Sequence, residues 1–188
     1  AVAPDADYVA VEIDDEYMIL ALARLELLGL GGCEVLERLK GSDLATINGV
    51  YYESLYNPHQ FGEERKRLEF INEAEVLGAP RLKLQKPREK LNYKVIAADF
   101  VSMEEGTGIV HVAPAFGEVD FKVGMHPDYC LDFVQPVDLQ GNIIGTYPFA
   151  GKFVKDADPL IIEDLKSRGL LYRSERITHT YPFCWRCE

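Results

Sequence analysis

The sequence predicts an α+β domain with a closed or partly closed sheet and a few peripheral helices. Its 188 residues are 47% apolar and 27% charged, a composition that supports one full hydrophobic core or two small ones. Short segments that alternate apolar and polar residues recur between glycine, proline and acidic turn signals, and they predict many short strands. Only about three segments have helical spacing or composition, so a sheet-based fold follows.

The first two predicted strands form a hairpin. Residues 7–14, DYVAVEID, alternate apolar and polar side chains as a half-buried strand does. Residues 16–24, EYMILALAR, follow so closely that the chain must turn at Asp14 and Asp15. The overlapping LARLELLG (22–29) favours a short helix that ends at the glycines that follow.

Three further segments complete the first half of the chain. CEVLERLKG (33–41) fits a helix or a strand, and GVYYESLYNP (49–58) predicts a strand that ends in a turn. Residues 61–79 have helix-forming composition and many opposite charges at helical spacing. They predict a helix with a thin apolar face.

Two more strands are predicted on either side of a glycine-rich turn, at 94–102 and 108–113. In the second, Ile109, His111 and Ala113 share one face because strand side chains alternate. A short helix is expected to begin near Gly117.

The last third of the chain predicts two short strands and one helix. The strands lie within 131–154, around a turn at 140–142. The helix is the clearest in the sequence: Asp156 or Asp158 can cap it, Pro159 is expected in its first turn, and Gly169 ends it.

The charge distribution limits how the chain can meet nucleic acid. The formal net charge is −11, so the surface as a whole does not attract phosphate. The local exception is RLKLQKPREKLNYK (81–94), whose six basic residues are opposed only by Glu89. A solvated strand and loop explain these charges equally well.

The sequence carries no membrane or export signal. No stretch approaches the ~20 apolar residues that span a bilayer, and the start lacks a signal peptide's basic head and apolar run. A cytoplasmic protein is therefore expected.

The four cysteines do not suggest a disulfide framework. Cys33 and Cys130 stand alone and are expected to be ordinary thiols, whereas Cys184 and Cys187 form a C-x-x-C pair. In a reducing compartment such a pair indicates half of a metal site or a redox motif.

The stretch GTGIVHVAPAFGEVD (106–120) concentrates the candidate site residues. Its first glycines let backbone approach a ligand, and its A-P-A run makes a rigid turn with small side chains. On the residues alone, His111 fits a core histidine more often than a catalyst, and Asp120 could simply stabilise a helix N-terminus.

The pattern G-T-G-I-V-H-x-A-P-A-F-G-x-x-D resembles the signature of the editing domain inserted into class I isoleucyl-tRNA synthetases. The valyl and leucyl enzymes share its G-T-G segment and its P-A turn ending in an aspartate, but differ at His111 and at the following F-G. HTYPFCWRCE (179–188) resembles the element where the family's chain returns to the synthetase body, and VAPDADYVAVE resembles the segment after the domain's entry strand. The resemblance spans nearly the whole chain and is weakest at 55–90.

The resemblance implies a β-barrel-rich fold, with residues 1–188 as a single editing domain, a fragment of a synthetase, and 179–188 as its return segment. The synthetase's ATP-binding signatures, His-Ile-Gly-His and Lys-Met-Ser-Lys-Ser, are absent, so the chain is not expected to charge tRNA. The synthetase pocket that accepts isoleucine rejects valine only weakly, because one methylene contributes little binding energy. This family is the standard example of that limit on discrimination. The implied reaction is water-driven hydrolysis of valine from the tRNA for isoleucine, with valyl-adenylate as a second substrate.

The resemblance also implies roles for individual residues. Asp120 matches the carboxylate that pairs with the substrate's α-ammonium group, and His111 matches the residue beside the terminal ribose and the ester. The expected substrate-binding residues are Gly106, Thr107, Gly108, Ala113, Pro114, Ala115, Phe116 and Gly117. The family's pocket also uses a threonine-rich strand, T-T-T-P-W-T, just before the segment that begins at Ala1; this chain has no such run, which leaves its activity in isolation open.

Cofactors and partners follow from the same resemblance. Editing needs no cofactor; ATP and Mg²⁺ belong to the absent synthetase core. Zinc is expected only in the full-length protein, with Cys184 and Cys187 supplying half of its four ligands. The expected partners are the tRNA for isoleucine and the rest of the synthetase chain, in a monomer with no membrane contact.

Three other functions stay open at this point. The C-W-R-C pair fits a thiol oxidoreductase, although such motifs open a helix and this one ends the chain. The basic stretch 81–94 fits a noncatalytic RNA-binding module. The shared motif also fits the editing domain of a valyl enzyme.

Overall fold

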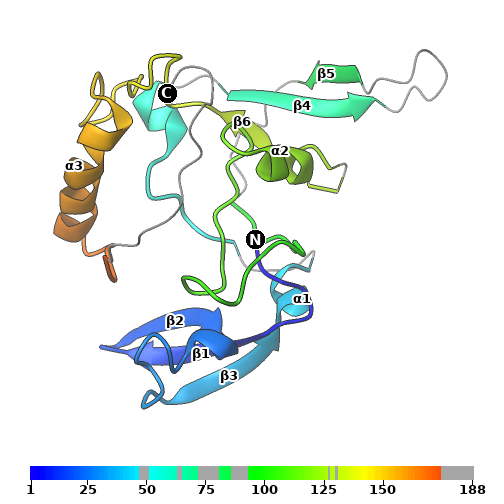
Figure 1. Cartoon of the computed structure of the whole chain (residues 1–188), viewed down its shortest axis with the longest axis vertical. Coiled ribbons are helices and arrows are strands. Elements are labelled where there is room, and N and C mark those ends of the chain that lie inside the picture. Colours follow the sequence, from blue (N-terminus) through cyan, green and yellow to red (C-terminus); the bar gives the residue numbers. More distant parts are fainter. Residues whose placement is uncertain are drawn as a thin grey trace, which may run out of the picture. The chain divides into compact units, whose positions relative to one another are not determined.

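The computed structural model describes residues 1–46, 51–62, 65–71, 81–85, 93–126, 128–129 and 131–174 (Figure 1). The chain divides into two compact units, Ala1–Pro136 and Val137–Glu188, and each is treated separately below. The prediction that residues 1–188 form one domain, with 179–188 as a return segment, stays a prediction. Among the described residues, no helix is both long and apolar enough to cross a bilayer.

The first sheet confirms the predicted hairpin. Strands β1 (Asp7–Ile13) and β2 (Glu16–Ala21) pair in antiparallel fashion, and β3 (Val35–Lys40) adds to the other edge of β1 (Figure 1). Asp14 and Asp15 have φ values of 51° and 65°, the left-handed conformation that a two-residue hairpin turn requires. β3 also resolves the ambiguity of residues 33–41 in favour of a strand.

The two faces of this sheet are covered by different parts of the chain. Because Val9 pairs with Leu20, both lie on one face, and both belong to a buried cluster completed by Val11, Leu25 and Leu30. Tyr8 pairs with Ala21 on the other face, in a cluster with Val2 and Leu44. The segment after β2 is a 3₁₀ turn, η1 (Leu22–Arg24), followed by turns that end near Cys33, so the short helix expected there is a single turn.

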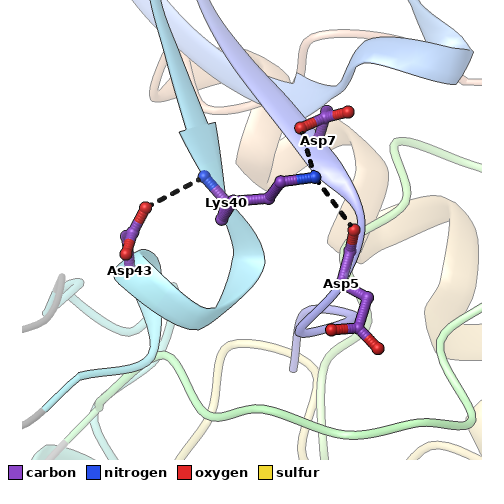
Figure 2. Close-up of polar contacts among 4 residues, drawn as sticks. All are labelled: Asp5, Asp7, Lys40 and Asp43. Atoms are coloured by element: carbon purple, nitrogen blue, oxygen red, sulfur yellow. Dashed lines mark hydrogen bonds and ion pairs between the residues drawn. The ribbon is translucent and has the colours of Figure 1, made fainter.

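A polar cluster ties the end of β3 to the start of β1 (Figure 2). The Lys40 ammonium lies 2.7 Å from Asp7 Oδ1 and donates to the carbonyl oxygen of Asp5 at 3.3 Å. The Lys40 amide donates to Asp43 Oδ2 at 3.3 Å, at the start of α1 (Gly41–Leu44). These contacts are on the surface, where an ion pair contributes about 1 kcal/mol or less to stability.

The second sheet corrects one prediction. Strand β4 (Arg65–Ile71) lies within the segment expected to be helical, and it pairs in antiparallel fashion with β5 (Arg81–Gln85) and β6 (Asp132–Val134). Charges at helical spacing contribute only tenths of a kcal/mol per pair, whereas two strand partners satisfy the backbone of β4 on both edges. Residues 63–64 and 72–80 of that segment lie outside the described residues.

The predicted strands at 94–102 and 108–113 are reduced to isolated bridges. Val2 pairs with Ala97 in parallel and with Ile109 in antiparallel fashion, so the amino-terminal segment lies between the two. The predicted strand at 49–58 likewise shows one bridge, Tyr51 with Lys94, before the 3₁₀ turn η2 (Pro58–Phe61); residues 47–50 lie outside the described part.

Helix α2 (Glu118–Gly124) begins after Gly117, as predicted. In the unit Val137–Glu188, helix α3 (Val154–Ser167) begins earlier than expected, so Pro159 lies inside it rather than in its first turn. Its end at Gly169, with φ of 69°, is confirmed. The turn at 140–142 is also confirmed, although only single bridges flank it, at Val137–Ile143 and Asn142–Phe153.

The architecture is therefore α+β, as predicted. Both sheets that the described strands form are open and three-stranded, and this part of the chain shows no barrel. The closed or partly closed sheet expected from the sequence is not found among these strands.

Candidate functional site

The G-T-G loop is attached to the first sheet through its carbonyl groups. The Ala21 amide donates to the carbonyl oxygen of Thr107 at 2.8 Å. The buried hydroxyl of Tyr8 donates to the carbonyl oxygen of Gly108 at 2.8 Å and accepts from the Ala3 amide at 2.9 Å. The loop is thus bonded to both β1 and β2.

Gly108 is required at its position for two independent reasons. Its φ of +74° is the left-handed conformation that side-chain-bearing residues adopt at a cost. A Cβ there would lie 2.4 Å from the Cβ of Ala21, well inside van der Waals contact. The group that approaches Gly108 closely is thus the protein's own β2, and the approach of a ligand to this turn stays a prediction.

The residues after Gly108 run beside the amino-terminal segment. The Val110 amide donates to the carbonyl oxygen of Ala1 at 3.0 Å, and the Ala1 nitrogen donates to the carbonyl oxygen of Val110. Ile109 and Val110 each expose 37% of their surface, so the predicted alternation does not separate a buried face from an exposed one. His111 follows directly and is exposed to solvent.

The A-P-A turn and helix α2 pack as one piece. The Phe116 amide donates to the carbonyl oxygen of Ala113 at 2.9 Å, which closes the turn. Pro114 is buried, and a Cβ on Gly124 would lie 2.6 Å from its Cγ. Only glycine allows this approach of the helix end to the turn. Gly124 is not among the residues predicted from the sequence, since nothing local marks its contact.

Asp120 lies in the first turn of α2, and its carboxylate folds back toward Gly117. A Cβ on Gly117 would lie 2.6 Å from Asp120 Oδ2 and 3.2 Å from its Cγ. Gly117 thus leaves the space in which this half-buried carboxylate lies. The helix N-terminus favours negative charge at that position.

His111 and Asp120 are close enough to influence each other's charge. Burial of part of the ring lowers the pKa of the His111 imidazole below 6.5, and the nearby Asp120 carboxylate partly offsets this effect. Because His111 as a residue is exposed, this desolvation is partial. The imidazole is therefore neutral at pH 7 and able to accept a hydrogen bond.

The structure brings some predicted site residues together and not others. His111, Asp120 and Gly117 lie in one neighbourhood, joined along the chain by Ala113, Pro114, Ala115 and Phe116. Gly106 is instead bonded to η1 and Thr107 to β2, and no hydrogen bond between described residues links them to Asp120. Cys184 and Cys187 lie outside the described residues, and the described part contains no group of three or more potential metal ligands.

Comparison with known proteins gives strong matches along the whole chain. The chain is 46% identical over all 188 residues to an isoleucine–tRNA ligase from Dehalococcoides mccartyi (strain CBDB1), and covers 17% of that protein. It is 40% identical to an isoleucine–tRNA ligase from Pyrococcus furiosus over 193 aligned residues, which cover 98% of the chain and 16% of the ligase. No family model matches.

A solved structure gives the fold. The crystal structure of GlLeuRS-CP1 matches with a TM-score of 0.51 at 16% identity, covering 95% of this chain and 77% of that one. At this identity the match shows a shared fold. The resemblance carried by the sequence motifs is thereby confirmed: the chain is similar throughout to one segment of isoleucine–tRNA ligases, a segment that makes up about one sixth of their length.

Proposed function

From this end-to-end similarity to isoleucine–tRNA ligases we propose that the chain is their editing segment, which hydrolyses valine from mischarged tRNA for isoleucine. The observation that carries the proposal is that His111 and Asp120, on either side of the A-P-A turn, lie near enough for the carboxylate to act on the imidazole charge. Both residues come from the motif that the sequence shares with the family, and an imidazole beside a carboxylate suits the hydrolysis of an ester that bears an amino group.

The proposed reaction uses water as the nucleophile. Water adds to the ester carbonyl carbon, and the bond between that carbon and the ribose oxygen breaks. The proton that water loses is transferred to the ribose oxygen, which leaves valine and a free tRNA 3′ end. Valyl-adenylate is a second substrate of the same chemistry, with the adenylate phosphate as leaving group.

Asp120 is proposed to bind the α-ammonium group of the valyl ester. A carboxylate suits this role because charge-assisted hydrogen bonds are short and directional. None of the described residues forms a hydrogen bond with Asp120, so its oxygens can accept one from a ligand.

His111 is proposed to orient the attacking water or the ribose hydroxyls. Its lowered pKa keeps the ring neutral at pH 7, and a neutral imidazole can accept a hydrogen bond from water. The small side chains of Ala113 and Ala115, on either side of buried Pro114, are proposed as the wall that admits valine and excludes isoleucine.

We further propose the other properties expected of an editing segment. The reaction needs no cofactor, ATP and Mg²⁺ serve the synthetase core, and zinc binding through Cys184 and Cys187 belongs to the full-length protein. A tRNA is the partner, the protein is a cytoplasmic monomer, and the complete fold is the β-barrel-rich one of editing domains.

A second candidate is a tRNA-binding module without hydrolytic activity. The basic segments Arg65–Arg67 and Arg81–Lys83 belong to β4 and β5, which pair with each other, so two basic segments lie in one ribbon of an otherwise acidic chain. Residues 86–92 of the predicted basic stretch lie outside the described residues. This ribbon supports tRNA contact in either function.

The test is deacylation of isoleucine tRNA charged with radiolabelled valine, by the full-length synthetase that the proposal implies. Asp120→Ala is expected to lower the rate about 100-fold, the equivalent of one charged hydrogen bond in the transition state. The control is Asp128→Ala, which removes the same charge from an exposed position after α2.

Three results would contradict the proposal. Unchanged turnover in Asp120→Ala would remove this carboxylate from the mechanism. Hydrolysis of threonyl-tRNA but not valyl-tRNA would indicate a valyl-type editing site. Binding of the charged tRNA without hydrolysis by the unsubstituted protein would favour the binding module.

A further inference from the structure

Arg24, which no sequence motif marks, binds the G-T-G loop from a position about eighty residues earlier in the chain. Its Nε donates to the carbonyl oxygen of Gly106 at 2.9 Å, and its Nη1 donates to that of Glu104 at 2.7 Å. The two nitrogens are adjacent donors of one planar guanidinium, so they fix both the distance and the orientation of the loop.

Arg24 completes a set of three bonds to three consecutive carbonyls. Gly106 accepts from Arg24, Thr107 accepts from Ala21, and Gly108 accepts from Tyr8. The donors come from η1, β2 and β1, so the loop is held by two strands of the first sheet and the turn that follows them.

The orientation of these carbonyls determines where the amides of the loop point. A trans peptide places its C=O and the following N–H on opposite sides, and the described part of the chain contains no cis peptide. The N–H groups of Thr107, Gly108 and Ile109 therefore point away from Arg24, Ala21 and Tyr8. None of these three amides donates to another described residue.

We propose that Arg24 is a positioning residue of the hydrolytic site, acting through the G-T-G loop on His111. This inference rests on the proposed function. His111 lies three residues after Gly108, and the residues between are paired with Ala1 and Val2. A shift of the loop is therefore transmitted to the imidazole and to the outward-pointing amides.

The same geometry explains why this role differs from a contribution to folding. The bonds from Arg24 are exposed to solvent, so water can replace them when the guanidinium is removed. Ala21 and Tyr8 would still hold the loop to the sheet. What is lost is the fixed position of the loop, and small displacements of groups near the reacting atoms can lower rates strongly.

The experiment compares Arg24→Gln and Arg24→Lys with Arg38→Gln, in the full-length synthetase. Arg38 carries the same charge on an exposed position of β3 and forms none of these bonds. The Arg24→Gln variant is expected to lose about tenfold in kcat for valyl-tRNA deacylation, with KM nearly unchanged. Lysine keeps a cation that can reach a loop carbonyl but lacks the planar pair of donors, so Arg24→Lys is expected to recover only part of the rate.

A second readout does not depend on catalysis. Hydrogen exchange of the Ala21 amide, which donates to Thr107, is expected to accelerate in Arg24→Gln and to stay unchanged in Arg38→Gln. Unchanged exchange at Ala21 in Arg24→Gln would overturn the positioning role, and so would an equal loss of kcat in Arg38→Gln. If Arg24→Gln unfolds, Arg24→Lys still decides, because normal exchange together with low kcat would contradict the inference.

The two proposals fail separately. Absence of valyl-tRNA hydrolysis in the unsubstituted protein would overturn the proposed function, and with it the role of Arg24 in catalysis. Loss of kcat on Asp120→Ala, with no effect of Arg24→Gln on either readout, would overturn the positioning role alone.

Discussion

The two halves of the G-T-G-to-aspartate motif are held in the fold by different means. In residues 106–108 each carbonyl is bonded to the first sheet or the turn after it, and Gly108 touches Ala21 so closely that no side chain fits. In residues 111–120 the polar side chains of His111 and Asp120 form no hydrogen bond with another described residue. They influence each other through charge alone.

This difference divides the motif into a scaffold half, residues 106–108, and a reactive half, residues 111–120, which is available for chemistry. Hydrogen-bonding groups that the fold already uses cannot bind a ligand without breaking those bonds. Groups that remain exposed or half-buried keep their full capacity. A segment that carries reactive groups next to a rigidly bonded loop is a common arrangement in binding sites.

The largest effect is expected from Gly108→Ala, which disturbs the backbone and packing of the scaffold half. The left-handed backbone costs about 1–2 kcal/mol for alanine, and the overlap with Ala21 adds about 1–3 kcal/mol. Stability and deacylation should therefore fall together. Thermal or denaturant unfolding measures the stability, and the valyl-tRNA assay measures the deacylation.

Gly106→Ala is the matched control for this substitution. Gly106 has φ of +55°, but a Cβ added to it would have nothing within 4 Å, so alanine there meets the backbone cost alone, about 1–2 kcal/mol. Equal destabilisation by the two substitutions would mean that the Ala21 contact does not hold the loop.

An intermediate effect is expected from Gly117→Ala, which changes the surroundings of Asp120 in the reactive half. Its φ of −145° is accessible to alanine, so the backbone is not strained. The new Cβ must displace the Asp120 carboxylate, which lies 2.6 Å from that position. Deacylation should fall about tenfold while the unfolding free energy changes by about 1 kcal/mol or less.

Gly32→Ala is the corresponding control, because a Cβ at Gly32 has nothing within 4 Å and the residue does not have a positive φ. A Gly117→Ala variant with full activity would show that the carboxylate can move without consequence, and the distinction between the two halves would then be lost.

The sequence predicted the fold well where local pattern and turn chemistry agreed. The hairpin of β1 and β2 follows from alternation plus an Asp-Asp turn, and α2 and the end of α3 follow from their boundary signals. The failures occurred where partners distant in sequence decide the structure. β4 has local charges typical of a helix but pairs with β5 and β6, and residues 94–102 pair only briefly with Val2.

The residues of the site divide in the same way, into those that a local motif marks and those that act from a distance in sequence. The motif indicated His111, Asp120 and the glycines directly, because these residues are adjacent in sequence. Their supports were not predictable: Arg24 and Tyr8 bind the loop from 82 and 100 residues away. Neither has a local feature that marks this contact, since an arginine in a turn and a tyrosine in a strand are ordinary.

The smallest and most specific effect is expected on the pKa of His111, when the charge of Asp120 in the reactive half is removed. Burial lowers the pKa of His111 below 6.5, and the Asp120 carboxylate is the group that raises it. Asp120→Asn should therefore lower the His111 pKa further, which the imidazole proton shifts in an NMR titration will measure. Asp128→Asn should leave that titration unchanged.

The sign of the pH dependence follows from the same shift. Because the folded protein disfavours the imidazolium, the contribution of His111 to stability is complete above about pH 6.5 and declines as pH falls toward its lowered pKa. Deacylation that uses the neutral ring should decline as pH falls through the lowered pKa. Asp120→Asn should extend the decline in stability to lower pH, because the upper end of that decline is set by the unfolded pKa near 6.5. A His111 pKa that stays constant or rises in Asp120→Asn would show that the carboxylate does not act on the imidazole, and the two residues could then not serve one site.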